Sequence, residues 1–172
     1  TAFEELYSRY KNPVYTYARR SLSRLSGDAA KSAVHDVFIR VYCDLRSLAK
    51  PDSFKIWIYR IASSICLKYS REGKAAPVMQ DDESVMALFL NTASVGSGLE
   101  LDRTNNKVRD LVRKEIEKLD EKMQELLILK FFDGLSSEEI AKIVRTPVRS
   151  VRSRLGKVIS RISQRLKKEE YI

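Results

Sequence analysis

Cysteine, histidine and glycine are scarce in this sequence, and their scarcity excludes several kinds of chemistry. Among 172 residues there are two cysteines, Cys43 and Cys66, and one histidine, His35. The cysteines lack the C-x-x-C spacing typical of many metal and redox sites, and their small number indicates a reducing compartment. His35 has no paired nucleophile, and no glycine-rich phosphate loop is present. We therefore expect no enzyme activity, no metal and no cofactor.

Long apolar runs are also missing. No stretch approaches the ~18 apolar residues that a membrane-spanning helix needs. The first residues lack the apolar core of a signal peptide. We expect a soluble, cytoplasmic protein without membrane insertion.

Charge is plentiful and unevenly distributed. The net charge is +9 and the pI about 9.6, a balance that favours nucleic acid as the partner. By segment the net charge is +7 over residues 1–71, −4 over 72–106 and +6 over 107–172. The middle segment also has the glycines and small polar residues of a linker. We predict two small domains, 1–71 and 107–172, joined by the acidic linker 72–106, with a short helix or a docked segment at its apolar patch 85–90.

The first domain has the apolar periodicity of helices throughout. One helix is expected over 2–24, which Pro13 should bend or split. A second should start at Asp28 as N-cap and continue to about Leu48, and a third should cover about 52–69.

The second domain has clear helix boundaries. Gly134 should end one helix in the left-handed conformation, and Ser136 with Glu139 forms a capping box for the next. Thr146 should cap the last helix, with Pro147 at its first position. No strand pattern occurs, so we predict an all-α fold. The expected helices cover about residues 106–119, 121–132, 136–144 and 147–168.

Two short helices joined by a tight turn, the second one basic, are typical of a helix-turn-helix. Between Arg145 and Lys168 there are nine Lys and Arg residues and no acid, which favours contact with DNA. The residues expected to face the major groove share one side of the final helix: Arg149, Arg152, Ser153, Gly156 and Lys157. Those expected to touch phosphates are Arg145, Arg154 and Arg161.

The segment LDEKMQELLILKFFDGLSSEEIAKIVRTPVRSVRSRL, residues 119–155, resembles the promoter −35-binding domain of extracytoplasmic-function sigma factors. The resemblance implies that Arg152, Ser153, Gly156 and Lys157 stand where that family reads the −35 element. Gly156 often has a bulkier counterpart there, and Arg145 replaces a usual glycine, so the base preference stays open.

The segment AVHDVFIRVY, residues 33–42, is similar to the helix with which the same family binds the clamp of the largest subunit of RNA polymerase. The resemblance implies that Asp36 pairs with a basic group of the clamp, and that Phe38 and Val41 help seat the helix. The alternative for Phe38 and Val41 is an ordinary core position.

The segment SFKIWIYRIA, residues 53–62, resembles the −10 region of the family. The resemblance implies that the loop 49–54 captures an extruded base. Aromatic faces can stack on unpaired bases while cations follow the backbone. Trp57 is expected in the core. The residues assigned to the −10 strand are Lys50, Ser53, Phe54, Lys55, Tyr59 and Arg60.

The sequence therefore indicates an alternative sigma factor that binds core RNA polymerase, recognises −35 and −10 promoter elements and initiates transcription of a specific regulon. An anti-sigma factor is an expected partner besides polymerase and promoter DNA. Two alternatives stay open: a stand-alone helix-turn-helix regulator, and a sigma-like protein that only binds an anti-sigma factor.

Overall fold

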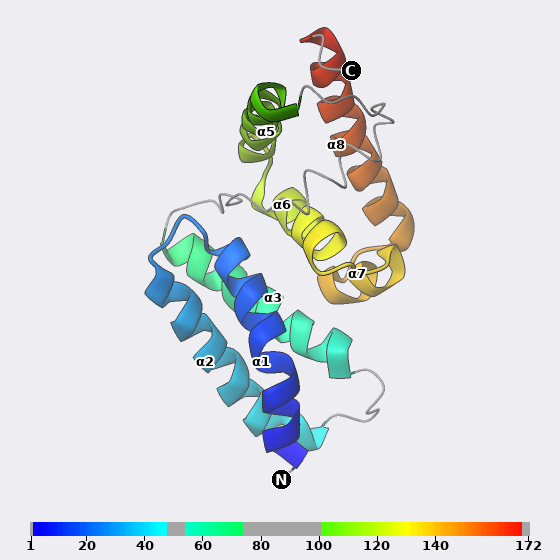
Figure 1. Ribbon diagram of the computed structural model, residues 1–172. Coiled ribbons are helices and arrows are strands. Elements are labelled where there is room, and N and C mark those ends of the chain that lie inside the picture. Colours follow the sequence, from blue (N-terminus) through cyan, green and yellow to red (C-terminus); the bar gives the residue numbers. More distant parts are fainter. Residues whose placement is uncertain (1, 48–53, 74–100, 170–172) are drawn as a thin grey trace.

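The computed structural model describes residues 2–47, 54–73 and 101–169, and all the secondary structure in these ranges is helical (Figure 1). The all-α prediction is confirmed. No helix of the described ranges is long and apolar enough to cross a membrane. The elements are α1 (Ala2–Ser21), α2 (Gly27–Asp44), the 3₁₀ turn η1 (Leu45–Ser47), α3 (Phe54–Glu72), α5 (Leu101–Glu117), α6 (Glu121–Leu127), the π-helical turn η3 (Ile128–Phe132), α7 (Ser137–Val144) and α8 (Val148–Lys168).

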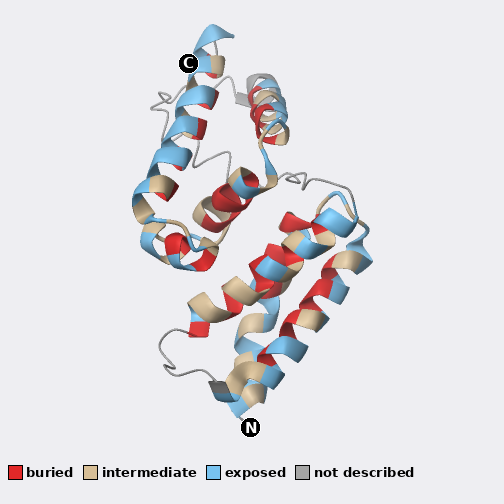
Figure 2. Ribbon diagram, turned by 180° about the vertical axis from the view of Figure 1, so that it is seen from behind, coloured by how far each residue is buried: buried red, intermediate tan, exposed pale blue. Residues whose placement is uncertain are grey.

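Helices α1, α2 and α3 pack against one another around an apolar core. Residues one turn apart on each helix face inward, as the helical period requires. Figure 2 shows the buried residues as a stripe along the inner side of each helix. The fully buried members include Val14, Val37, Val41, Ile58 and Ala62.

Pro13, which was predicted to bend or split the first helix, does not split it. It lies inside α1, which is assigned as one helix from Ala2 to Ser21. A proline in this place removes one amide donor. The residues that follow it, Val14, Tyr17 and Ala18, are almost completely buried, and their packing holds the helix together past the proline.

The start of α2 also differs from the prediction. Ser26, not Asp28, is the N-cap, and its side chain makes no capping hydrogen bond. Asp28 lies in the first turn, where a carboxylate is favoured by the helix dipole. The apolar patch 85–90 lies outside the described residues.

The second group of helices, α5 to α8, has polar groups at its centre. Gln124 is completely buried, and its side-chain nitrogen donates to the carbonyl oxygens of Ile116 and Leu119, each at 3.0 Å. Ile116 lies in the last turn of α5, and Leu119 lies just beyond the end of that helix. One amide therefore joins α6 to the end of α5.

A second buried polar group joins α5 to α8. The carboxylate of Glu115 accepts from Lys118 at 2.7 Å and pairs with Arg161 at 3.2 Å and Arg165 at 3.5 Å. The hydrogen bond from Lys118 is the largest cause of a lowered pKa of Glu115. A buried carboxylate surrounded by several donors stays charged, so this cluster fixes α5 on α8.

The predicted boundaries around α7 are confirmed. Gly134 has φ +63°, the left-handed conformation that glycine adopts without strain. The Ser136 side chain accepts from the amide of Glu139 at 3.1 Å, and Glu139 accepts from the amide of Ser136 at 2.9 Å. This reciprocal pair is the capping box expected from the sequence.

The turn between α7 and α8 is built differently from the prediction. Pro147, not Thr146, is the N-cap, and α8 begins at Val148. The hydroxyl of Thr146 donates instead to the carbonyl of Val144 at 3.3 Å. Arg145 ends α7 with φ 51°, a conformation in which glycine is usual.

The two helical groups pack on each other in a single body. Helix α3 lies against α7, and α1 contacts η3 (Figure 1). The guanidinium of Arg20 lies over the ring of Phe132, 4.1 Å from its centroid. Polar contacts also cross the seam between the groups, as described below.

The capping box gives a stability prediction. Ser136→Ala should lower the free energy of unfolding by about 1 kcal/mol, because the amide of Glu139 loses its acceptor. Urea denaturation followed by circular dichroism measures the change. Ser160→Ala, on the exposed side of α8, is the matched control and should have little effect. Equal losses for both substitutions would contradict a capping role.

Candidate nucleic-acid interface

Helix α8 separates an apolar side from a basic side. Its buried stripe consists of Val151, Leu155, Val158, Ile162 and Leu166. The residues predicted to face the major groove are all exposed, and their spacing places them on the opposite side of the helix. The structure therefore brings Arg149, Arg152, Ser153, Gly156 and Lys157 together on one accessible face.

One member of this face has a partner inside the helix-turn-helix. Arg152 of α8 forms an ion pair with Glu138 of α7, and both side chains are more than half exposed. A hydrogen bond from its own backbone amide, followed by the charge of Arg152, holds the pKa of Glu138 below its usual value. An exposed pair of this kind separates at little cost, so Arg152 is available for DNA.

The residues predicted to touch phosphates have different surroundings. Arg161 is held by the buried Glu115, as described above. Arg145 and Arg154 are exposed and line a groove of about 380 Å³ between α3 and the helix-turn-helix, together with Lys122 and Arg60. Arg161 therefore has a structural partner, whereas Arg145 and Arg154 line an open groove.

The residues predicted to hold the −10 strand lie on α3, and three of them contact the second helical group. Lys55 Nζ donates to Glu139 Oε1 at 3.4 Å. The Tyr59 hydroxyl donates to Asp133 Oδ1 at 3.1 Å. Arg60 donates to the carbonyl oxygen of Lys142 at 2.8 Å.

The other −10 candidates divide into two sets. Phe54 is 5% exposed and packs against Tyr10 and Trp57, with ring centroids 4.9 Å and 5.6 Å away. Its ring belongs to the core of the first group. Lys50 and Ser53 lie outside the described residues. Trp57, expected in the core, is only partly buried.

The residues predicted to bind the polymerase clamp lie on α2. Phe38 and Val41 are buried at 6% and 0% exposure, so the structure places them in the core rather than on the surface. Asp36 is partly exposed and accepts from the Tyr69 hydroxyl at 2.7 Å. The hydrogen bond to Asp36 is the largest cause of a pKa of about 12 for Tyr69. The exposed apolar residues on α2 are Ile39 and Tyr42.

The most buried part of the seam is organised by a residue that the sequence analysis did not single out. The Glu125 carboxyl of α6 accepts from the Tyr17 hydroxyl of α1 at 3.1 Å and from the Ser63 hydroxyl of α3. Burial raises the pKa of Glu125, and the two hydrogen bonds oppose that rise. An acid inside the largely apolar run MQELLIL, residues 123–129, on the side of the helix that faces inward, was the signal that could have revealed it.

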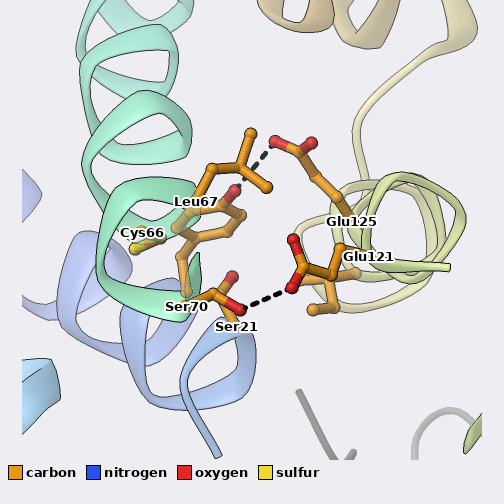
Figure 3. Close-up of a pocket in the computed structure, with 8 residues that line it drawn as sticks. Ser21, Cys66, Leu67, Ser70, Glu121 and Glu125 are labelled. Atoms are coloured by element: carbon orange, nitrogen blue, oxygen red, sulfur yellow. Dashed lines mark hydrogen bonds between the residues drawn. The ribbon is translucent and has the colours of Figure 1, made fainter. Parts of the chain in front are cut away.

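Beside Glu125 lies a small cavity. Figure 3 shows Glu121 and Glu125 directed toward Ser70, Leu67 and Cys66 of α3. Ser70 donates to Glu121 at 3.0 Å, and the cavity has a volume of about 20 Å³, the size that one water needs. Burial raises the pKa of the Cys66 thiol to about 12, so this cysteine is an unreactive packing residue.

Comparison with known sequences identifies both helical groups. Residues 6–75 match the family described as Sigma-70 region 2, and residues 109–162 match Sigma-70, region 4. The first match covers α1 to α3, and the second covers the helix-turn-helix. These two regions define a sigma-70 type transcription initiation factor.

Relatives that match almost the whole chain show to which group of sigma factors it belongs. The chain is 33% identical over 159 residues to the ECF RNA polymerase sigma-E factor of Escherichia coli K12, covering 90% of this chain and 81% of the relative. It is 29% identical over 172 residues to the sigma-E factor of Haemophilus influenzae, covering 96% and 87%. The chain therefore belongs to the extracytoplasmic-function (ECF) sigma factors: it initiates transcription and is not an enzyme.

Solved structures share the fold. The chain is similar to CnrH in complex with the cytosolic domain of CnrY, with a TM-score of 0.64, 20% identity and coverage of 97% and 88% of the two chains. It is also similar to the sigma factor RpoE in complex with the anti-sigma factor NepR from Bartonella quintana, with a TM-score of 0.63, 20% identity and coverage of 96% and 97%.

The carboxyl group of Asp133 at the seam predicts how the stability of the protein depends on pH. Burial raises the pKa of Asp133 to about 6, against the smaller opposing effects of Tyr59, Arg20 and Lys55. Because the folded pKa is raised, Asp133 favours the folded, closed protein most below about pH 4, and this contribution is lost as pH rises through about 6. Asp133→Asn keeps an oxygen acceptor for Tyr59 but does not titrate.

The measurement compares the free energy of unfolding in urea at about pH 5 and about pH 7.5 for both proteins. The wild type should lose roughly 1–3 kcal/mol more than Asp133→Asn over this range. Taking the difference between the proteins removes the effect of the other carboxyls, including those of lowered pKa such as Glu115 and Glu139. Parallel pH profiles for the two proteins would show that Asp133 does not titrate in this way.

Proposed function

We propose that this ECF sigma factor reads the −35 element with the exposed face of α8, formed by Arg149, Arg152, Ser153, Gly156 and Lys157. The observation that carries the proposal is the one-sided basic face of a helix whose other side is buried. Arginine can donate two hydrogen bonds to guanine in the major groove. Gly156 has open space where a Cβ would lie, so larger residues fit here too.

The proposed phosphate contacts are Arg145, Arg154 and Arg161. Arg145 and Arg154 are exposed beside the recognition helix and can reach the backbone of the duplex. Arg161 is the weakest candidate of the three, because it is already paired with the buried Glu115. Phosphate contacts fix the position of the helix on DNA and carry little sequence information.

The −10 element is assigned to the first domain. Lys55, Tyr59 and Arg60 lie along α3, where two cations and an aromatic ring can follow the backbone and bases of an unpaired strand. Phe54 supports this surface from the core through its contact with Trp57. Lys50 and Ser53 complete the set by their place in the sequence.

The polymerase clamp is assigned to α2. Asp36 offers a partly exposed carboxylate for a basic group of the largest subunit. Because Phe38 and Val41 are buried, their role is to fix α2 on the domain rather than to touch the clamp. The neighbouring Ile39 is half exposed and adds an apolar contact on the outer side of the helix.

The proposed organisation is a region 2 domain over 1–71, a linker over 72–106 and a region 4 domain over 107–172. We place the protein in the cytoplasm, where RNA polymerase works. An anti-sigma factor is proposed as a further partner, since the sigma factor RpoE of Bartonella quintana is similar to this chain and was solved with the anti-sigma factor NepR.

Recognition of the −35 element is tested by two arginine substitutions. Arg152→Ala should reduce discrimination between the preferred and other −35 sequences by about 1–3 kcal/mol. Arg154→Ala should weaken binding to all duplexes alike and lower the salt dependence of binding. Holoenzyme binding to duplexes of varied −35 sequence, measured at two salt concentrations, gives both quantities. Equal loss of selectivity for the two variants would refute the assignment.

Run-off transcription over a promoter library tests the bipartite function. Core polymerase with this protein should select promoters that share two sequence blocks, one near −35 and one near −10. Lys55→Gln should weaken selection of the −10 block and leave the −35 block unchanged, because the two blocks are read by different domains. Tight −35 binding without polymerase, or binding of an anti-sigma factor without transcription, would favour the alternative functions.

A further inference from the structure

The groove between α3 and the helix-turn-helix gathers cations from four separate elements. Arg60 comes from α3, Lys122 from α6, Arg145 from the end of α7 and Arg154 from α8. We name this concavity the basic groove. Its volume of about 380 Å³ is within the range of sites that hold small molecules. Because the four residues are far apart in the sequence, only the packing of the helices brings their charges together.

Little negative charge balances these cations. The one acid among the described residues that line the basic groove is Glu125, whose carboxyl is already engaged by two hydroxyls. Within the described ranges, no acid forms an ion pair with Lys122, Arg145 or Arg154. In the same part of the chain, the Nε atom of Arg60 is buried without a hydrogen-bond partner. The groove therefore offers charged donors to an anion.

The backbone of Arg145 adds an independent reason to expect a function here. This residue has φ 51°, a left-handed conformation that is unfavourable for a residue with a side chain and usual for glycine. Strained positions of this kind cluster at functional sites. Glycine would relieve the strain but would remove a positive charge from the groove, so the charge is what distinguishes the arginine.

A second groove of about 470 Å³ continues the first. The lining residues that the two have in common are Arg60, Ser64 and Arg145. The wall of the second groove includes the partly buried Trp57, and its other charged residues, Arg40 and Asp44, form an ion pair with each other. An indole ring can stack on a nucleobase. The combined site thus has cations at one end and an aromatic ring at the other.

We propose that the two grooves bind a nucleoside diphosphate or triphosphate, with its phosphate chain among the cations of the basic groove and its base against Trp57. The guanidinium fork matches two phosphate oxygens at once, and several cations suit a chain of phosphates better than a single one. Lys122 has no part in the proposed promoter contacts and belongs to this site alone. The protein is then a nucleotide-binding protein besides a DNA-binding one.

Equilibrium binding to the full chain without DNA tests the site. The probes are ATP, GTP, inorganic triphosphate and adenosine, at about 0.15 M salt. Binding is read by calorimetry and by quenching of Trp57, the sole tryptophan. ATP and GTP should bind and quench, because stacking accepts either base. Triphosphate should bind about tenfold more weakly and adenosine more weakly still, since each keeps only one of the two contacts.

Two substitutions locate the phosphate chain. Arg145→Gly and Lys122→Gln should each weaken ATP binding about tenfold, because each removes a charged donor. Lys114→Gln removes the same charge from an exposed position of α5 outside both grooves and should change the affinity by less than about twofold. Arg145→Gly should also be at least as stable toward urea as the wild type, because glycine adopts this φ without strain. Its loss of binding then cannot come from unfolding.

The base contact is located by Trp57→Leu, which calorimetry should find to bind ATP no more tightly than triphosphate. Absence of ATP and GTP binding to the folded wild type would overturn the proposal. An equal loss in Lys114→Gln would do so too, because the nucleotide would then follow net charge alone. Wild-type ATP affinity in folded Lys122→Gln and Arg145→Gly would show that the basic groove is not the site. Equal affinity of the wild type for ATP and triphosphate would rule out a nucleotide as the ligand.

Discussion

The buried carboxyl group of Glu125 determines how the two regions of this sigma factor are held together. Removing a carboxylate from water is unfavourable unless donors replace the lost hydration, and here the hydroxyls of Tyr17 and Ser63 do so. The two donors come from α1 and α3, so the acid sets the position of α6 on both helices at once. Polar contacts of this kind require correct alignment. When they separate, the same groups form hydrogen bonds with water, which offset much of the loss. The seam is therefore specific without being permanent.

The apolar core of each region, unlike the polar contacts of the seam, holds its helices together permanently. The stripe that runs from Val151 to Leu166 cannot be exposed without a large loss of free energy, so α8 stays fixed on its region. Because that stripe occupies one side of the helix, the arginines on the other side are held at fixed spacing toward solvent. Glu115 acts further along α8: it pairs with Arg161 and Arg165, far from the turn, and leaves the proposed DNA-reading residues in the first turns of the helix without that restraint. The helical period places the apolar residues of α8 on one side, where they form the core, and the basic residues on the other side, where they are accessible.

Much of this was predictable from the sequence, because it depends on local pattern. The capping box at Ser136, the left-handed Gly134 and the apolar stripe of α8 are each set by residues close in the chain. The Thr146 prediction was wrong because the neighbouring Arg145 takes the left-handed position. The split considered at Pro13 does not occur because the buried residues that follow it carry α1 past the proline. The contacts of Tyr59, Lys55 and Glu125 join residues more than 60 positions apart, and no local pattern encodes such pairing.

The location of the seam suggests how it opens. Helix α3 faces region 4 with Tyr59 and Arg60, whereas α2, the proposed clamp helix, exposes Ile39 and Tyr42 to solvent. The clamp can therefore bind region 2 while the seam is still closed. A ligand shifts such an equilibrium only as far as it binds the open form more tightly than the closed one. Polymerase meets that condition if it holds the two regions at sites too far apart for the seam to persist.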